Sequence, residues 1–364
     1  MRNLLYLLPV LIFISTIGCE GDYRKRAIGD IDEIYVVIDT TKANAETRMA
    51  IEDTFAKPTV GVPGYEPYYN LRYVHFNTND ELERLKERKN VIFVAPIDEQ
   101  SNVGSFIRAL LSDDVENRVR NDESFAFPLE DNWVRDQWIL LLTSSSDSAL
   151  ASKIRSSEES LLSHKLDREL ARWEADVYAK LEQTNLSDYL WDNYGWKVRI
   201  QHDYVINVDT LNFVSMRRYL PQNDRWMWAW WMDDVENIDF VDSNWIHTTR
   251  DSLMEKYVRG ERERSYVTTD YRMTIETNEF EKNGLQAIES LGIWRMTADF
   301  MGGPFVNFTY YDPETQRLFM VEYGQFAPSV FKRRFVRQFR AMGRTFEVDR
   351  DFNKTEESLA DAQE

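Results

Sequence analysis

The first half of the chain alternates short apolar runs with polar segments of helical periodicity. Ile34-Tyr35-Val36-Val37-Ile38 is typical of a buried strand, because such strands are short and continuously apolar. A helix led by Asn44 follows it, and a charged helix is predicted over 80–88. Strands and helices therefore alternate through a first lobe at residues 31–145. Its expected strands are 34–38, 71–76, 91–94 and 138–143.

A long segment without proline or glycine follows this lobe. Over residues 148–182 apolar side chains recur every three or four positions, with one longer gap at Ser156-Ser157. This spacing predicts a single amphipathic helix. At about 1.5 Å per residue the helix would be longer than a small domain is wide. A connector packed across both lobes is favoured over a free coiled-coil dimerisation arm, because few clean heptads are present.

The second lobe, residues 196–348, is richer in strands. Asp312-Pro313-Glu314-Thr315 separates two alternating segments and predicts an antiparallel hairpin. Helices over 243–257 and 329–342 are expected to cover the sheet. The predicted class is therefore α+β, with two lobes of mainly antiparallel sheets covered by helices and joined by the long amphipathic helix. Residues 349–364 form an acidic end that we expect to be frayed.

An apolar segment near the N-terminus ends at the sole cysteine, Cys19. Arg2 gives a positive start, residues 4–14 are uncharged, and Thr16-Ile17-Gly18 precedes the thiol, which is the layout of a secretory signal. The pattern resembles a bacterial lipobox, in which the sulfur is acylated and the chain is cut before the cysteine. Residues 1–18 are then a lipoprotein signal peptide, and residues 19–30 a flexible polar tether.

Two other interpretations of this segment are weaker. A transmembrane anchor needs about 20 apolar residues, and residues 4–14 are too few. A soluble secretory signal would leave Cys19 incidental, although a lone cysteine cannot form an intramolecular disulfide. We therefore predict lipidation of Cys19, for example by palmitate, and attachment to the cell envelope. Glu20 is compatible with sorting to the outer membrane.

Composition indicates a folded body with an acidic surface. Hydrophobic residues make up 43% of the chain and aromatic residues 13%, which is enough apolar surface to form a core. The formal net charge of −18 argues against nucleic acid as a partner, because phosphate binding needs a basic face. No pair among the four histidines has the spacing of a metal site, so neither a metal nor a cofactor is expected.

Several motifs in the last third carry a resemblance to a known family. They are Met301-Gly302-Gly303-Pro304-Phe305, Val321-Glu322-Tyr323, Ala327-Pro328 and the basic helix from Lys332. With these motifs the chain resembles the domain of unknown function 4837, a family of bacterial envelope lipoproteins. The resemblance implies a lipid-anchored envelope protein and supplies no catalytic residues.

Tryptophans concentrate in the second lobe. Trp226, Trp228 and Trp230 alternate along one predicted strand, so their rings share a face. Such a row is core if a helix covers it, which is the favoured interpretation, and a stacking platform for sugars if it is exposed. Trp231 lies on the opposite face beside Asp233-Asp234 and is the ring expected to be exposed.

The predicted C-terminal helix has a basic side. Arg333, Arg337, Arg340 and Arg344 lie opposite its apolar residues, and arginine forks suit phosphate or carboxylate groups. The first three are candidate ligand-binding residues for a lipid headgroup or an anionic glycan. The simpler interpretation is an outer face that is solvated or paired with neighbouring carboxylates.

Three further candidates are weaker. Gly302-Gly303 before Pro304 could form an anion nest, although a structural turn is favoured. His247 and Asp251, one helical turn apart, could act with Ser252 or Ser265 in a hydrolase, but no Gly-x-Ser-x-Gly motif supports this. Glu322, in a predicted strand, is expected to face solvent or to pair with Arg295.

Together these patterns favour a lipid-anchored envelope protein with a non-enzymatic binding or scaffold role. The expected partners are the membrane, through the lipid, and an envelope glycan or another protein. No catalytic residue is assigned. The alternative is a hydrolase that acts on an envelope polymer.

Overall fold

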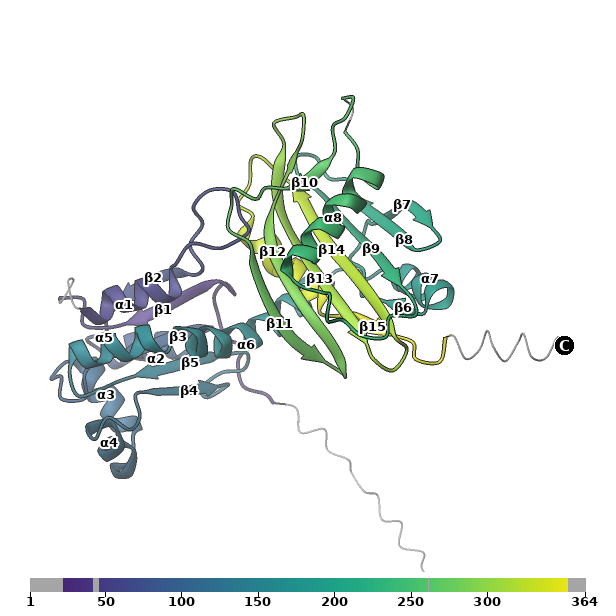
Figure 1. Ribbon diagram of the computed structural model, residues 1–364. Coiled ribbons are helices and arrows are strands. Elements are labelled where there is room, and N and C mark those ends of the chain that lie inside the picture. Colours follow the sequence, from purple (N-terminus) through teal and green to yellow (C-terminus); the bar gives the residue numbers. More distant parts are fainter. Residues whose placement is uncertain (1–21, 42–45, 261, 353–364) are drawn as a thin grey trace, which may run out of the picture.

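The computed structural model describes residues 22–41, 46–260 and 262–352. These residues form two lobes, and helix α6 (Glu158–Tyr178) leads from the first lobe to the second (Figure 1). The two lobes confirm the predicted α+β class. Cys19 and most of the acidic end lie outside the described residues.

The first lobe is a five-stranded sheet in the order β2-β1-β3-β5-β4. Its pairings are parallel except that of β4 with β5, so the expectation of a mainly antiparallel sheet does not hold for this lobe. The alternation of strand and helix along the chain explains this, since parallel neighbours need helical crossovers. The strands are β1 (Glu33–Val37), β2 (Asn70–Val74), β3 (Asn90–Val94), β4 (Ala126–Glu130) and β5 (Trp138–Leu142).

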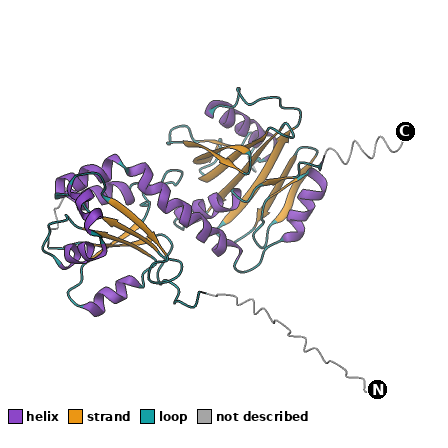
Figure 2. Ribbon diagram, turned by 90° about the horizontal axis from the view of Figure 1, so that it is seen from below, coloured by secondary structure: helices purple, strands orange, loops and turns teal. Residues whose placement is uncertain are grey.

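Helices cover both faces of this sheet (Figure 2). Helices α1 (Glu46–Phe55), α5 (Asp147–Ser156) and α6 share one apolar core with the sheet, and α2 (Asn79–Lys86) and α3 (Asn102–Leu110) share another on the opposite face. Helix α4 (Asp113–Arg120) follows α3. Strands β3 and β5 lie between the two cores, and every residue in them is buried.

The predicted connector consists of two helices instead of one. Helix α5 ends at Ser156 and α6 starts at Glu158, with Ser157 outside helical geometry between them. Ser156 donates its hydroxyl hydrogen bond to the carbonyl of Lys153 at 3.1 Å. Serine side chains that bond to nearby backbone compete with helix continuation, which explains the break at the gap in the apolar spacing.

The second lobe is built on an antiparallel eight-stranded sheet in the order β10-β12-β13-β14-β9-β8-β7, with β11 also paired to β12. The hairpin predicted at 312–315 joins β13 to β14 and is confirmed. The strands are β7 (Val205–Thr210), β8 (Phe213–Arg218), β9 (Asp224–Met232), β10 (Val267–Thr269), β11 (Glu276–Lys282), β12 (Leu285–Met296), β13 (Gly302–Asp312) and β14 (Arg317–Phe326).

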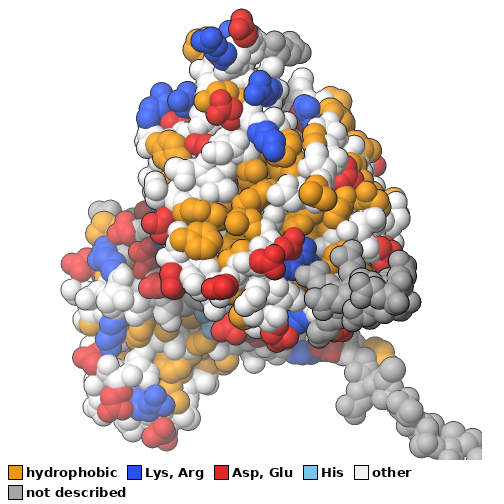
Figure 3. Space-filling model, turned by 45° about the vertical axis from the view of Figure 1, so that its right-hand side comes forward, with side chains coloured by type: hydrophobic (Ala, Val, Ile, Leu, Met, Phe, Trp, Pro, Cys, Tyr) orange, Lys and Arg blue, Asp and Glu red, His pale blue; other side chains and the backbone are white. Residues whose placement is uncertain are grey.

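Helix α8 (Ser243–Tyr257) covers one face of this sheet. Its apolar residues pack with Phe213, Trp228 and Met320. Figure 3 turns the right-hand side of Figure 1 forward, and it shows hydrophobic side chains gathered on this lobe among charged ones. Part of the apolar surface is therefore open to solvent, including Leu211 in the turn between β7 and β8.

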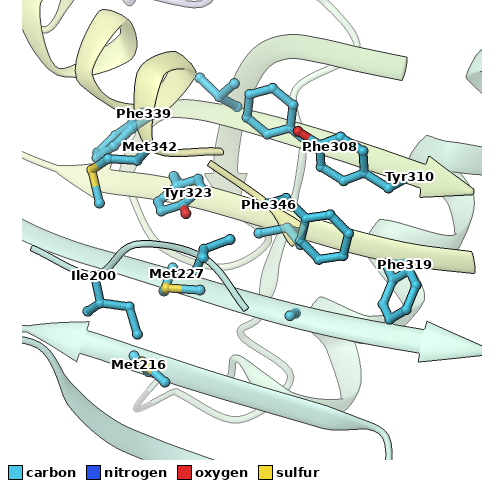
Figure 4. Packing of buried hydrophobic residues seen from close by; sticks show 14 of the residues in the cluster. Ile200, Met216, Met227, Phe308, Tyr310, Phe319, Tyr323, Phe339, Met342 and Phe346 are labelled. Carbon is cyan, nitrogen blue, oxygen red and sulfur yellow. The ribbon is translucent and has the colours of Figure 1, made fainter. Parts of the chain in front are cut away.

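The opposite face carries the larger core. Helices α7 (Thr184–Tyr194) and α9 (Arg333–Gly343) cover it together with the end of α6 and the small sheet of β6 (Trp196–Lys197) and β15 (Glu347–Val348). Figure 4 shows Phe339 and Met342 of α9 packed over Tyr323 of β14. The core thus fixes α9 between the sheet and the first lobe.

The Gly302-Gly303 pair belongs to strand β13 and is not a separate loop. A β-carbon on Gly303 would clash with the carbonyl of Gln325 on the neighbouring chain segment. The close approach of two backbones therefore accounts for the glycine.

None of the helices in the described ranges has both the length and the apolar character needed to span a membrane.

Candidate functional site

The basic side of α9 faces the first lobe. Arg333 pairs with Asp32 at the start of β1, and Arg337 pairs with Glu169 of α6. Arg333 is 8% exposed and Arg337 is 3% exposed. Glu169 is fully buried and also accepts hydrogen bonds from Tyr69 (2.6 Å) and Trp173 (2.9 Å). These groups connect α9 to both the sheet and the last helix of the first lobe.

Arg340 makes the third buried pair, within the second lobe. Its guanidinium donates to both oxygens of Glu289 on β12, at 3.0 and 2.7 Å, and Arg344 contributes a third bond at 3.3 Å. Burial alone would raise the pKa of Glu289, but the charges of Arg340 and Arg344 outweigh it and lower the pKa below its ordinary value. Glu289 is therefore ionised at neutral pH.

A glutamate from the first lobe caps the N-terminus of α9. Glu66 accepts the backbone N–H bonds of Lys332 and Arg333 at 2.7 and 2.8 Å, and it is 5% exposed. An anion at this position satisfies free amides and opposes the positive end of the helix dipole. Because Glu66 lies in the loop between α1 and β2, the cap also joins the two lobes.

The prediction that the basic side of α9 faces solvent is therefore wrong. Arg333, Arg337 and Arg340 are buried in the protein. A carboxylate of the same chain fills the fork of Arg340, and Arg333 and Arg337 each bond one carboxylate and one backbone carbonyl. The interpretation as ion pairs agrees with the structure, whereas an open anion site at these residues does not.

Sequence reasoning missed the carboxylates Glu66, Glu169 and Glu289. A signal for Glu169 was present, because Lys165, Glu169 and Arg172 follow one another at spacings of four and three on α6. All three are buried. Charged residues in a row beside the apolar stripe of a helix indicate that this helix has a second face packed against protein.

A buried polar cluster lies under α8. Glu322 of β14 is fully buried and accepts both bonds of the Arg250 fork, at 2.7 and 2.9 Å. Asn307 and Trp228 also donate to it, at 3.2 and 3.3 Å. Its partner is thus Arg250, and the expectations of solvent exposure or pairing with Arg295 are wrong. The cause is the cover of this sheet face by α8.

The hydrolase candidates His247 and Asp251 do not form a catalytic pair. Neither ring nitrogen of His247 has a hydrogen-bond partner among the described residues. Burial, and then the charge of Arg250, lower the pKa of His247, so the ring is neutral at neutral pH. Asp251 instead accepts bonds from other side chains, namely those of Arg250, Thr268, Thr269 and Tyr271.

The two candidate serines also bond elsewhere. Ser252 donates its hydroxyl to the carbonyl of Thr248, and Ser265 donates to Asp299. The structure therefore brings no serine, histidine and carboxylate together at these positions.

The tryptophan row on β9 is mainly core. Trp228 is fully buried, and Trp226 and Trp230 are half-buried against the same cluster under α8. The favoured interpretation agrees with this placement. Trp231 was expected to be exposed, but it is only 4% exposed. Tyr194 and Trp196 cover its face, with ring centroids 4.8 and 5.7 Å away.

A hollow nevertheless opens at the edge of Trp231. Its volume is about 560 Å³, and it lies between the C-terminal part of α7, the turn between β7 and β8, and the end of β9. Its lining includes aromatic and acidic side chains. Among them are Tyr189, Tyr194, Asp209, Trp231, Asp233 and the guanidinium of Arg317.

Hydrogen bonds hold the polar groups of this hollow in place. Tyr189 and Tyr194 donate their hydroxyls to the two oxygens of Asp209, at 2.7 and 2.5 Å. Arg317 donates to Asp233 at 2.6 Å. Burial and the bond to Asp209 raise the pKa of Tyr194, so its hydroxyl stays protonated and donating. The hollow therefore presents fixed rings and exposed carboxylates to solvent.

No group of three His, Cys, Asp or Glu side chains suited to a metal ion occurs within residues 22–41, 46–260 and 262–352.

Comparison with protein families divides the chain at the end of α6. Residues 183–345 match the Domain of unknown function (DUF4837). This match covers most of the second lobe. The resemblance predicted from the sequence is thus confirmed. Residues 27–178 match a second family, the Domain of unknown function (DUF8532), so α5 and α6 belong to the first lobe.

No curated protein matches the chain. Nine chains of solved structures match, among them a mutant of the protein Mog1, with a TM-score of 0.29 and 6% sequence identity over 43% of this chain and 91% of that one. A likeness of this size carries no argument about function.

The family motifs can now be placed within the DUF4837 domain. Met301 to Phe305 opens β13, Val321 to Tyr323 lies in the middle of β14, and Lys332 precedes α9. Glu322 and Lys332 both lie in buried polar contacts. These motifs of the DUF4837 domain therefore support α8 and the docking of the DUF8532 lobe, and they do not line the hollow beside Trp231.

Proposed function

We propose that this protein is a lipid-anchored cell-envelope protein that binds an envelope glycan in the hollow beside Trp231. The observation that carries the proposal is the combination of aromatic rings with fixed carboxylates in one opening. Its volume of about 560 Å³ lies within the usual range for small-molecule sites, roughly 300–1,000 Å³. The proposed role is non-enzymatic, because binding of the glycan requires no catalytic residue.

The side chains of the hollow suit a neutral sugar. Aromatic rings such as Tyr189 stack on the apolar faces of sugar rings, because they offer flat area with a polar edge. Asp209 and Asp233 can accept hydrogen bonds from sugar hydroxyls. Arg317 is buried and holds Asp233 in place. The two carboxylates disfavour an anionic polymer, since like charges would lie close together. We therefore propose an uncharged stretch of glycan as the ligand.

Attachment to the envelope is part of the same proposal. Acylation of Cys19 would hold the folded body near the outer membrane. The polar tether is shorter than the predicted 19–30, because the backbone of Ala27 and Ile28 is hydrogen-bonded to Arg135 and Glu87 of the first lobe. A glycan of the envelope is within reach of a body held in this way. In this proposal the lipid holds the protein at the membrane, and the hollow binds the glycan.

The test uses co-sedimentation of the full chain with purified peptidoglycan sacculi, and calorimetric titration with a trimer of N-acetylglucosamine. We expect Tyr189→Ala to weaken binding at least about tenfold, since it removes a stacking ring. Tyr219→Ala is the matched control, because Tyr219 is an exposed tyrosine outside the hollow.

Wild-type protein that stays in the supernatant and gives no heat with the trimer would contradict the proposal. Equal loss in both tyrosine variants would contradict the assignment to the hollow. Release of new reducing ends from the sacculi would instead favour the hydrolase alternative.

A further inference from the structure

Two arginines face each other across strands β8 and β9 without a carboxylate between them. Arg218 and Arg225 are directly paired in the antiparallel register. They are 6% and 7% exposed. Like charges directly opposite in a sheet destabilise it, because opposed side chains lie only about 5 Å apart. Burial increases the repulsion further. Such a pair requires a compensating group.

The protein itself supplies little compensation. Both guanidiniums donate to the neutral amide oxygen of Gln201, at 2.8 Å from Arg218 and 3.4 Å from Arg225. Arg218 Nη2 also lies 3.3 and 3.2 Å from the two ring nitrogens of His202, and Arg225 donates to the amide oxygen of Asn223 at 3.3 Å. The exposed carboxylate of Asp203 lies 3.8 Å from Arg218, beyond hydrogen-bond distance. No ion pair of Arg225 occurs among the described residues. Burial lowers the pKa of Arg225 to about 10, so the side chain remains charged at neutral pH.

The neighbouring Arg217 has a carboxylate partner, in contrast to Arg225. Arg217 precedes Arg218 on β8 and points to the other face of the sheet. It donates both Nε and Nη2 to the carboxylate of Asp224. The lack of such a partner at Arg218 and Arg225 is therefore specific to their face of the strands.

The two arginines open into a hollow of about 280 Å³. Lys180, two residues after α6, His202, and Arg334 from α9 line its remaining sides. Asp176 is the carboxylate in this lining, and it pairs with Arg334 at 3.2 Å. The hollow is thus strongly cationic, although the chain as a whole carries a formal net charge of −18.

We infer that this hollow is a binding site for a small phosphate monoester. Guanidinium forks bind phosphate oxygens in pairs, and a monoester carries about −1.5 to −2 charges at pH 7. Two arginines without a carboxylate at hydrogen-bond distance match that charge, because the exposed carboxylate of Asp203, 3.8 Å from Arg218, offsets only part of it. The volume lies near the lower limit of small-molecule sites, so it suits a compact ligand and not a polymer.

The site is independent of the proposed glycan hollow. Arg225 and Trp231 lie six residues apart on β9, which is about 20 Å along the strand. Phe335 of α9 stacks against Arg225 at 4.3 Å, so the anion site involves α6, α9 and the sheet. A bound phosphate would connect these three elements, and binding should raise the melting temperature of the protein.

The experiment is a calorimetric titration and a thermal melt of the full chain in detergent, with three probes. They are glycerol 3-phosphate, inorganic phosphate, and succinate as a dianion without phosphorus. We expect the two phosphates to bind and to raise Tm, and succinate to bind at least about tenfold more weakly. Arg225→Gln and Arg218→Gln should each reduce phosphate affinity at least about tenfold.

The unliganded variants separate a binding role from a structural one. Because each substitution removes like-charge repulsion, Tm without phosphate should be unchanged or higher. Arg217→Gln is the control: it should leave phosphate affinity unchanged, since Arg217 lies on the other face and is already paired.

Three results would overturn the inference. One is no heat and no change in Tm with either phosphate at about 10 mM, well above a millimolar Kd. Another is phosphate binding that persists in both arginine variants. The third is succinate binding as tightly as glycerol 3-phosphate, which would assign the hollow to carboxylates.

Discussion

At the scale of single residues, some buried charged side chains have an oppositely charged partner and others do not. Glu289, Glu169 and Glu322 are each fully buried and paired with an arginine. Breaking such a pair leaves an uncompensated charge in the interior, which is strongly destabilising. Arg225 already lacks a carboxylate partner within the described residues. This contrast separates groups that stabilise the fold from groups available to a ligand.

Glu289→Gln tests the contribution of a buried, paired carboxylate to stability. We expect a loss of about 3–5 kcal/mol in the free energy of unfolding at neutral pH, because Arg340 would remain buried with its charge unpaired. Urea denaturation monitored by tryptophan fluorescence measures this loss. A variant within about 1 kcal/mol of wild type would show that the pair contributes no more than an exposed one.

We also expect the stability difference between wild type and Glu289→Gln to depend on pH. The pKa of Glu289 is lower in the folded protein than its ordinary 4.5, so the folded state binds this proton more weakly than the unfolded chain does. Its stabilising contribution is therefore present above about pH 4.5 and is lost as the pH falls through the folded pKa. The difference between wild type and Glu289→Gln should shrink in acid. A constant difference between pH 7 and pH 3 would contradict this.

At the scale of elements, α9 is the part of the chain that both lobes share. Its apolar side packs on the sheet at Tyr323, its basic side pairs with Glu169 of α6, and its N-terminus is capped by Glu66. One helix thus has three different neighbours. Its amphipathic pattern was readable from the sequence, but the partner of its polar side was not.

Glu66→Gln tests the cap. The amide still accepts one hydrogen bond but loses the charge that opposes the helix dipole, so we expect a loss of about 0.5–2 kcal/mol. The backbone amides of Lys332 and Arg333 should also exchange faster with deuterium, which mass spectrometry measures. Glu123→Gln, at an exposed position of the first lobe, is the control. Equal exchange at α9 in both variants would contradict the role of Glu66.

Prediction from the sequence succeeded where the pattern was local. The hairpin at 312–315 and the strands at 34–38 and 91–94 follow from short-range periodicity and turn residues. The burial of Trp231 was missed because it depends on Tyr194 and Trp196, which approach only in the folded lobe. The anion site was missed for the same reason, since the strand register that opposes Arg218 and Arg225 is set by the whole sheet.

At the scale of the whole molecule, buried ion pairs join a DUF8532 lobe to a DUF4837 lobe. Arg337 reaches Glu169, and Arg333 reaches Asp32, across the boundary between the two families. Interfaces between domains are usually more polar than domain cores, and these charges are withdrawn from solvent. The lobes are therefore expected to unfold together.

Arg337→Gln tests the joining of the lobes. We expect a loss of about 3–5 kcal/mol and a thermal transition that divides into two steps by calorimetry, because Glu169 loses its partner in the other lobe. Arg334→Gln is the matched control on the same helix. Arg334 is exposed, and removal of its pair with Asp176 should change stability by less than about 1 kcal/mol. A single unshifted transition in Arg337→Gln would show that the lobes are joined by other contacts.

The central proposal is that this two-lobed body works while held at a membrane by lipid on Cys19. The most direct test is to label cells with a clickable fatty acid, separate membranes from soluble fractions, and compare wild type with Cys19→Ala. The wild-type protein should carry the label and sediment with the membranes, and the variant should lose both properties. A wild-type protein that is unlabelled and remains in the soluble fraction would contradict the proposal.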